Sequence, residues 1–207
     1  LLRVFYLESL KKYLGINSFI HFDNDVLIYK NFNQVKNSFD NSKFNITPAS
    51  EKLCIFGYSY IHDLRPINLI NQKILETAEF GIKHNWQFNY GKPLNEMSFI
   101  GTIQKDYPEL FNLLPIFPYD TKYPFDPAGY GQFLDGTFVH PKKFYSGVYA
   151  NINEYIGREI ISKRIKVRFK NNKPQVIWKN QSFELVNLHI HSKRMNKFLP
   201  TNYKEFI

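Results

Sequence analysis

The spacing of apolar and polar residues predicts three helices in the first half of the chain. We place them at residues 3–14, about 66–80, and from 95 to about 113. The positions expected to face inward are Phe5, Leu10 and Leu14 in the first helix and Ile67, Ile70 and Ile74 in the second, with Leu75 as a further candidate. Gly15 is a stop signal for the first helix, and Asn95 is a suitable cap for the third.

Apolar runs and alternating patterns predict strands, mainly in the last third of the chain. The expected strands are residues 19–28, 53–61, 160–169, 175–178 and 183–191. Residues 31–51 are polar and are interpreted as a loop, as are the Pro- and Gly-rich residues 115–136. Asn171-Asn172-Lys173-Pro174 is predicted to be a turn. Because helices and strands alternate early and strands follow late, we expect an α/β fold with a mixed sheet.

The length and composition indicate one globular domain over residues 1–207. The chain has 207 residues and is 43% hydrophobic, enough to bury a substantial core. Its one cysteine, Cys54, lies in an apolar run and is expected to be a buried thiol, which excludes an internal disulfide. No apolar stretch is long enough to span a bilayer, and no signal peptide is recognisable. We therefore expect a soluble protein of the cytoplasm, without a transmembrane segment.

The charge favours anionic partners. The formal net charge is +9, which suits nucleotide diphosphates, nucleic acid or an acidic membrane surface. The strongest basic run alternates Lys166, Arg168 and Lys170 with apolar residues, and this alternation is typical of a half-exposed strand. Such a strand can be an ordinary solvated face or a binding surface.

Two aspartates interrupt the first apolar strand. Asp23 and Asp25 occur within Phe19–Ile28, where an unpaired acid would be costly to desolvate. Alternate residues of a strand point to the same face, so the two carboxylates would form an oxygen site for a hard divalent cation that carries phosphates. The simpler alternative is an Asp-Asn-Asp turn at the end of a strand.

A second polar cluster, at residues 187–193, strengthens the first. His189 and His191 share one face of a predicted strand, and Lys193 continues beside them. Neutral imidazole is a good ligand for divalent metals, and a lysine ammonium is a point charge for phosphate oxygens. A single histidine would more often be structural. Two histidines and a lysine, in a chain that also carries paired aspartates, favour a metal site.

Four segments, taken in order, resemble a known family. Arg3-Val4-Phe5-Tyr6-Leu7 and Phe22-Asp23-Asn24-Asp25-Val26-Leu27 resemble the arginine-bearing helix and metal strand of GT-A fold glycosyltransferases. Asp126-Pro127-Ala128-Gly129-Tyr130-Gly131-Gln132 and Leu188-His189-Ile190-His191-Ser192-Lys193 resemble a subgroup found in bacteria and in large DNA viruses that glycosylate their capsids. The resemblance covers most of residues 1–200. It implies a three-layer GT-A-like fold of the nucleotide-diphospho-sugar transferases, with a central mixed sheet.

The resemblance also implies an activity. The protein would be a hexosyltransferase-like enzyme of class 2.4 that uses Mn²⁺ or Mg²⁺ to move a sugar from a nucleotide-diphosphate donor, most plausibly a UDP-sugar, to a glycan or glycoprotein. It would bind no nucleic acid and, if viral, would act in the host cytoplasm. The implied metal ligands are Asp23, Asp25 and one or both of His189 and His191; the implied donor-binding residues are Arg3, Asp23, Asn24, Gln132 and Lys193; the implied catalytic residues are Glu96 and Asp126. Asp135 is a further candidate for the pocket.

The chain departs from the family pattern in two places. GT-A enzymes usually begin with two strands that bind the nucleotide base, and we expect this chain to lack them. Asn95-Glu96 differs from the Asp-Gln of retaining relatives, so the stereochemistry does not carry over.

Two other functional classes fit parts of the sequence. A basic nucleic-acid-binding protein would account for the charge and the interleaved aromatics, although it has no need of paired carboxylates. A metal-dependent phosphodiesterase or nuclease could use Asp23, Asp25 and the histidines, but that class generally needs more ligands, spaced for two metals.

Overall fold

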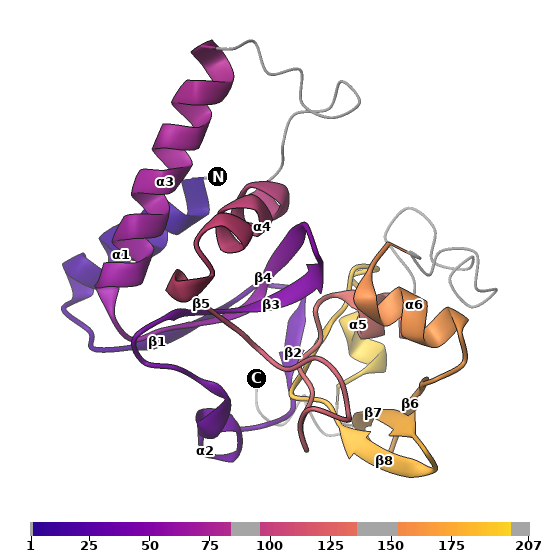
Figure 1. The fold of residues 1–207 in the computed structure, drawn as a ribbon. Coiled ribbons are helices and arrows are strands. Elements are labelled where there is room, and N and C mark those ends of the chain that lie inside the picture. Colours follow the sequence, from indigo (N-terminus) through magenta and orange to yellow (C-terminus); the bar gives the residue numbers. More distant parts are fainter. Residues whose placement is uncertain (1, 84–95, 136–152, 200–207) are drawn as a thin grey trace. The chain divides into compact units, whose positions relative to one another are not determined.

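The computed structural model describes residues 2–83, 96–135 and 153–199 (Figure 1). Contacts divide the chain into two compact units. The first contains Leu1–His21 and Phe39–Leu114, and the second contains Phe22–Ser38 and Pro115–Ile207. Each unit has a hydrophobic cluster of its own.

The first unit consists of helices and a mixed sheet. Its helices are α1 (Leu2–Leu14), α3 (Leu64–Lys83) and α4 (Glu96–Asp106), followed by a 3₁₀ turn, η3 (Pro108–Leu110). Its strands are β1 (Phe19–Phe22), β3 (Phe44–Ser50), β4 (Leu53–Ile61) and β5 (Phe111–Leu113), in the order β1-β4-β3-β5. Because β3 is antiparallel to β4 and parallel to β5, the predicted α/β class with a mixed sheet is confirmed. Figure 1 shows the three helices on the same side of this sheet.

The helices of the first unit pack with apolar stripes toward the sheet. Ile67, Ile70 and Ile74 of α3 are buried as predicted, whereas Leu75 is exposed. The predicted inward face of α1 is right for Phe5, which packs against the core, and wrong for the other two residues. Leu10 and Leu14 are exposed, and the buried positions are Val4, Leu7 and Lys11, which follow the spacing of one helical face. Lys11 is buried because its Nζ donates to the carbonyl oxygens of Ile16 and Asn17, beyond the end of the helix, at 2.8 and 2.5 Å.

The polar segment interpreted as a loop contains a buried strand. β3 carries Asn45 and Thr47 with no exposed surface, and both side chains are satisfied within the sheet. Asn45 Nδ2 donates to Tyr60 O at 3.1 Å, and Thr47 Oγ1 donates to Ile55 O at 3.0 Å. Polar residues can therefore occupy this central strand because the adjacent strand supplies their hydrogen-bond partners. Cys54 is buried in β4 as expected, and burial raises the pKa of its thiol to about 12.

The second unit contains the remaining elements. Its helices are α2 (Phe32–Val35), α5 (Gly129–Asp135) and α6 (Tyr155–Ile161), with 3₁₀ turns η1 (Lys36–Ser38) and η5 (Met195–Lys197). Its strands are β2 (Val26–Ile28), β6 (Lys166–Lys170), β7 (Lys173–Trp178), β8 (Gln181–Glu184) and β9 (Asn187–His189). β2 pairs with β9, and β6, β7 and β8 form an antiparallel sheet. The segment 115–136, interpreted as a loop, thus contains α5, and part of the strand predicted over 160–169 is the end of α6.

The hairpin between β6 and β7 forms as predicted. Asn171 and Asn172 lie in the left-handed region, with φ of 53° and 57°. Two consecutive residues with positive φ are typical of the primed turns that match the twist of paired strands, and asparagine tolerates this conformation. The hairpin leaves Lys166, Arg168 and Lys170 exposed on β6, in agreement with the half-exposed strand expected from the alternation. Among the described residues, no helix is long and apolar enough to cross a membrane.

We predict that Gly101→Ala destabilises the first unit. A Cβ at Gly101 in α4 would overlap the main-chain carbonyl of Lys52, between β3 and β4. Alanine normally stabilises a helix relative to glycine by about 1 kcal/mol, so a loss of stability would reveal the clash. We expect a loss of about 1–3 kcal/mol in the free energy of unfolding, measured by chemical denaturation. Lys105→Ala, at an exposed position of the same helix, is the control and should change stability little. A stabilised Gly101→Ala variant would contradict this close packing.

Candidate metal centre

The carboxylate-bearing segment is a turn between two strands. β1 ends at Phe22 and β2 begins at Val26, and the two strands belong to different sheets. Between them Asp23-Asn24-Asp25 forms a turn, in which the N–H of Val26 donates to Asp23 O at 3.0 Å. The prediction of one strand with both aspartates on its face was therefore wrong. The simpler alternative, an Asp-Asn-Asp turn, describes the backbone, yet this turn still directs both carboxylates to one place.

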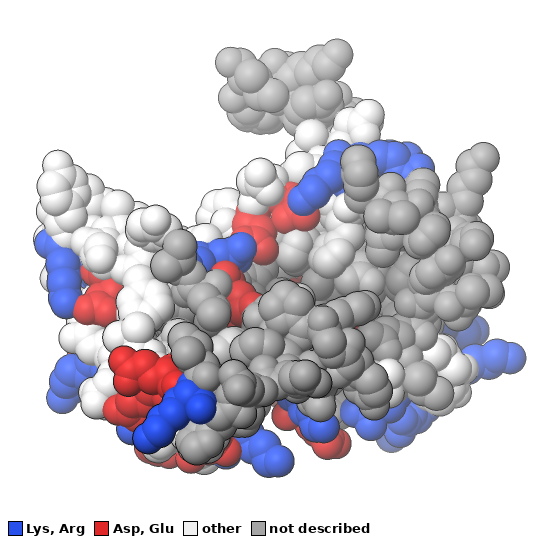
Figure 2. Space-filling view, turned by 90° about the horizontal axis from the view of Figure 1, so that it is seen from above, with Lys and Arg blue, Asp and Glu red and all other residues white. Residues whose placement is uncertain are grey.

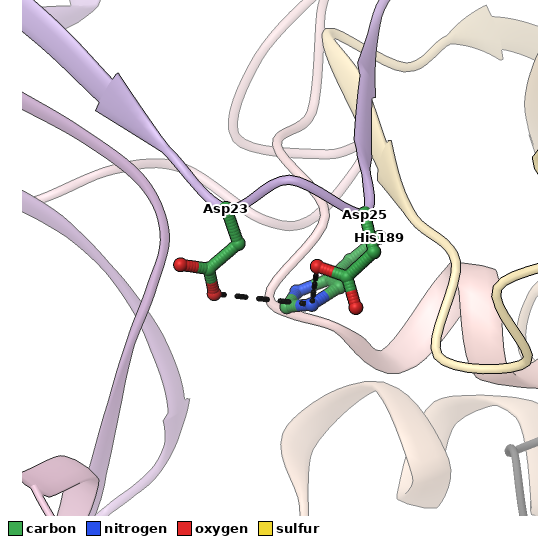
Figure 3. A group of neighbouring side chains, drawn as sticks. All are labelled: Asp23, Asp25 and His189. Atoms are coloured by element: carbon green, nitrogen blue, oxygen red, sulfur yellow. Dashed lines mark ion pairs between the residues drawn. The ribbon is translucent and has the colours of Figure 1, made fainter.

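Both carboxylates, of Asp23 and Asp25, point toward the imidazole of His189. Its Nε2 lies 3.0 Å from Asp25 Oδ1 and 4.0 Å from Asp23 Oδ2, and Figure 3 shows both carboxylates directed toward the ring. Strand pairing explains the convergence, because Val26 of β2 stands opposite His189 of β9. The N–H of Ile190 also donates to the main-chain oxygen of Asp25 at 2.7 Å. The β2–β9 pairing and this hydrogen bond keep the side chains of Asp25 and His189 next to each other.

Lys193 completes the polar contacts of Asp25. Its ammonium pairs with Asp25 Oδ2, while His189 contacts Oδ1. Burial by itself raises the pKa of Asp25, which is only 5% exposed. The hydrogen bonds from His189 and Lys193, together with their charges, outweigh this effect and hold the pKa of Asp25 well below its usual range. Asp25 is thus a carboxylate at neutral pH.

Asp126 is bound to the main chain of His189 and has no exposed surface. Its carboxylate accepts hydrogen bonds from the N–H groups of Tyr130 at 2.9 Å, Gly131 at 3.0 Å and His189 at 2.9 Å. Burial raises its pKa, and the three N–H groups counter that rise only in part. Such a carboxylate cannot reach a substrate, so the predicted catalytic role is corrected to one of positioning. It joins the first turn of α5 to the main chain of His189.

Gly131 lets α5 approach β9. A Cβ at this position would overlap the main-chain oxygen of His189. The glycines of segment 126–132 are buried in the helix α5, so they allow close packing instead of only breaking regular structure. Asp126 followed by a Gly-x-Gly helix start is a signal for this contact, although the same residues also fit the loop predicted over 115–136.

His191 stands beside the group without belonging to it. Its ring centroid is 4.4 Å from that of His189, and its Nδ1 is 3.4 Å from Gln132 Nε2. Burial, and then the charge of His189, lower the pKa of His191 to about 4. Among the described residues, no hydrogen-bond partner is found for the buried His189 Nδ1 or His191 Nε2. The geometry thus favours His189 over His191 as the metal ligand, a choice that the sequence left open.

Asp135, the further pocket candidate, anchors the segment that follows β9. It is fully buried and pairs with Arg194 and Lys197, each at 2.8 Å, and it accepts a hydrogen bond from Ser192. Two of these contacts hold the side chains of Ser192 and Arg194, the residues on either side of Lys193. The carboxylate of Asp135 is therefore already paired with neighbouring side chains.

Arg3 and Glu96 lie in the first unit. Arg3 Nε is 3.4 Å from Glu96 Oε1, and the guanidinium lies 5.6 Å from the centre of the Phe56 ring. α4 begins at Glu96, close to the predicted start, and the predicted cap Asn95 lies outside the described residues. The two residues assigned to the donor sugar and to catalysis are thus partners of each other. Asn24, assigned to the donor, is exposed in the Asp-Asn-Asp turn.

The donor set fits a divalent cation. One ligand atom each from Asp23, Asp25 and His189 lies within 4.8 Å of the others, so a single ion can contact all three. Two carboxylate oxygens and one imidazole nitrogen suit Mn²⁺ and, less closely, the oxygen-preferring Mg²⁺. Three protein ligands leave coordination positions for phosphate oxygens or water.

Figure 2 shows a face of the molecule with mixed charge. On the face drawn in Figure 2, Lys and Arg side chains lie next to Asp and Glu side chains.

Comparison with protein-family models, with curated proteins and with solved structures found no match to this chain. The functional argument therefore depends on the geometry of the candidate metal centre.

We predict that His191 titrates with a pKa of about 4 in the metal-free protein. Unfolding should return its pKa to about 6.5, so between these values the unfolded chain binds the extra proton. The contribution of His191 to stability is then complete above about pH 6.5 and is lost as the pH falls toward 4. NMR titration of the ring gives the pKa, and denaturation in EDTA across this range gives the slope. His191→Gln should flatten the slope; a pKa near 6.5 in the folded protein would contradict the burial of this ring.

We predict that Asp126→Asn lowers stability and disturbs the position of His189. An amide cannot accept hydrogen bonds from all three N–H groups, and leaving a buried donor unpaired costs about 1–3 kcal/mol. Chemical denaturation should show a loss of this size, and Mn²⁺ affinity should fall in the part of the population that stays folded. Asp120→Asn makes the same chemical change at an exposed position and should affect neither quantity. Wild-type stability of Asp126→Asn would contradict the assigned role.

Proposed function

We propose that this protein is a metal-dependent glycosyltransferase with a GT-A-like, three-layer fold. It would move a sugar from a nucleotide-diphosphate donor, such as a UDP-sugar, to a glycan or glycoprotein. The observation that carries the proposal is the convergence of Asp23, Asp25 and His189, with the ammonium of Lys193 on the same carboxylate. The resemblance of the four sequence segments to GT-A enzymes supports it, and the mixed α/β sheet is compatible with it.

The chemistry of sugar transfer explains why such a group is useful. When the bond between the sugar and the diphosphate breaks, an additional negative charge develops on the departing phosphate. A bound divalent cation supplies Lewis-acid stabilisation for that charge. Asp25 and Asp23 would hold the cation as carboxylates, and His189 would hold it through the nitrogen that faces them. Lys193 would place a further positive charge beside the phosphates, where stabilisation of developing charge has its largest effect.

Neighbouring residues would orient this group. Asp126 holds the main chain of His189, and Asp135 holds the side chains of Ser192 and Arg194, on either side of Lys193. His191 remains a neutral imidazole and contacts Gln132, so this pair offers polar atoms without adding charge. Glu96, which pairs with Arg3 in the first unit, remains our candidate for assisting the acceptor hydroxyl.

The alternatives have less support. A two-metal phosphodiesterase needs a second group of ligands, and within the described residues Asp23, Asp25 and His189 are the only such group. A nucleic-acid-binding protein is suggested by the basic residues of β6, but Phe169 and Trp178 of the β6–β8 sheet pack against the core. They are thus unsuited to stacking on bases.

We predict that Asp25→Asn removes Mn²⁺-dependent binding of UDP. The amide lacks the charge that holds the cation, and it also loses the interactions with His189 and Lys193. Isothermal titration calorimetry of UDP in the presence of Mn²⁺ is the measurement, with circular dichroism as the check on folding. Asp120→Asn is the matched control and should bind as the wild type does. If folded Asp25→Asn protein binds UDP with undiminished Mn²⁺ dependence, the candidate metal centre is not the donor site.

A further inference from the structure

Lys193 occupies an unusual place for a residue beside a metal centre. Its ammonium pairs with Oδ2 of Asp25, the same carboxylate whose Oδ1 faces His189. A cation held by Asp25 and His189 would therefore share that carboxylate with a positive charge. Asp25 is only 5% exposed, so water screens this part of the site poorly and the repulsion between the two cations is strong. Lys193 must oppose the binding of a bare ion.

The same lysine is free to turn elsewhere. Its side chain is 55% exposed, although its partner Asp25 is buried. Its backbone, in contrast, is fixed: the N–H of Lys193 donates to Ile190 O at 2.9 Å, and the flanking Ser192 and Arg194 are bound to Asp135. The φ of Lys193 is 63°, a left-handed backbone conformation that residues other than glycine adopt at a cost in free energy. A rigid backbone thus presents a long and accessible ammonium at the rim of the metal group.

We propose that Lys193 makes metal binding depend on a diphosphate. Without a diphosphate its charge weakens the hold of Asp25 on a divalent cation. A nucleoside diphosphate brings negative charge for both cations, so the ammonium turns from Asp25 to a phosphate oxygen and the repulsion is relieved. The ion and the diphosphate then bind cooperatively, and the centre has low affinity for the free metal. This inference rests on the proposed function, because it requires a diphosphate donor.

Linkage gives the proposal a measurable form. If UDP raises the affinity for Mn²⁺ by some factor, Mn²⁺ must raise the affinity for UDP by the same factor. Part of that factor is assigned here to Lys193. Its removal should therefore have opposite effects on the two ligands: tighter binding of Mn²⁺ alone and weaker binding of UDP in the presence of Mn²⁺. A lysine that only contacts phosphate would change the second quantity and leave the first as it was.

The experiment compares Lys193→Gln with the wild-type protein and two controls. Free Mn²⁺ is measured by electron paramagnetic resonance, with and without UDP, and UDP binding by calorimetry at saturating Mn²⁺. Lys193→Arg keeps the charge and should retain cooperativity. Lys173→Gln removes the same charge from a lysine that is similarly exposed, at 48%, and paired with Glu184, and should behave as the wild type does. For Lys193→Gln we expect Mn²⁺ alone to bind at least about fivefold more tightly and the cooperativity factor to fall, because coupling factors are typically 5–150.

The outcomes separate this inference from the proposed function. Unchanged or weaker binding of Mn²⁺ alone to folded Lys193→Gln protein, with weaker UDP binding, overturns the inference and leaves a metal-dependent diphosphate site in place. An equal gain in Mn²⁺ affinity in Lys173→Gln assigns the effect to net charge and also overturns it. If the wild-type protein binds neither Mn²⁺ nor UDP, in any combination, both proposals fail.

Discussion

The buried carboxylate of Asp126 is the interaction on which the second unit depends. One side chain accepts hydrogen bonds from the first turn of α5 and from the main chain of His189, so it joins a helix to the strand that carries the metal ligand. Asn187 reinforces the joint by accepting from the N–H of Asp126 at 3.1 Å. Because Asp126 and Asn187 have no exposed surface, water cannot replace a lost bond. The position of His189 is thus set by buried polar contacts.

Two carboxylates in this unit have different tasks because different charges surround them. Asp135 is neutralised by Arg194 and Lys197, which lie close to it in the fold and leave it no capacity for a ligand. Asp25 meets one imidazole and one lysine that is free to move, and Asp23 stands beside it. The second arrangement keeps negative charge available for a cation. Both Asp25 and Asp135 are buried, so water screens their charges weakly and the neighbouring cations act strongly on each carboxylate.

The elements that the sequence predicted well are those with strong periodicity. α3 was found with its three isoleucines inward, β4 was found with its bounds, and the Asn171-Asn172 turn was found from residue types that accept positive φ. Two of the failures share one cause. β3 contains buried Asn45 and Thr47, and α5 contains glycines, and in both cases the neighbouring element supplies the hydrogen bond or the close packing. Local sequence patterns contain no information about such partners, because they belong to another element.

For the site, the sequence by itself determined the kinds of atoms available: carboxylates at Asp23 and Asp25, an imidazole at His189 and an ammonium at Lys193. Those types already indicated a divalent cation and phosphate, because their chemistry does not depend on the fold. Only the tertiary structure decided that the aspartates lie on a turn, that His189 and not His191 joins them, and that Asp126 is buried support. The physical reason is that the pairing of β2 with β9 brings distant residues into register, and that register is a property of the folded sheet.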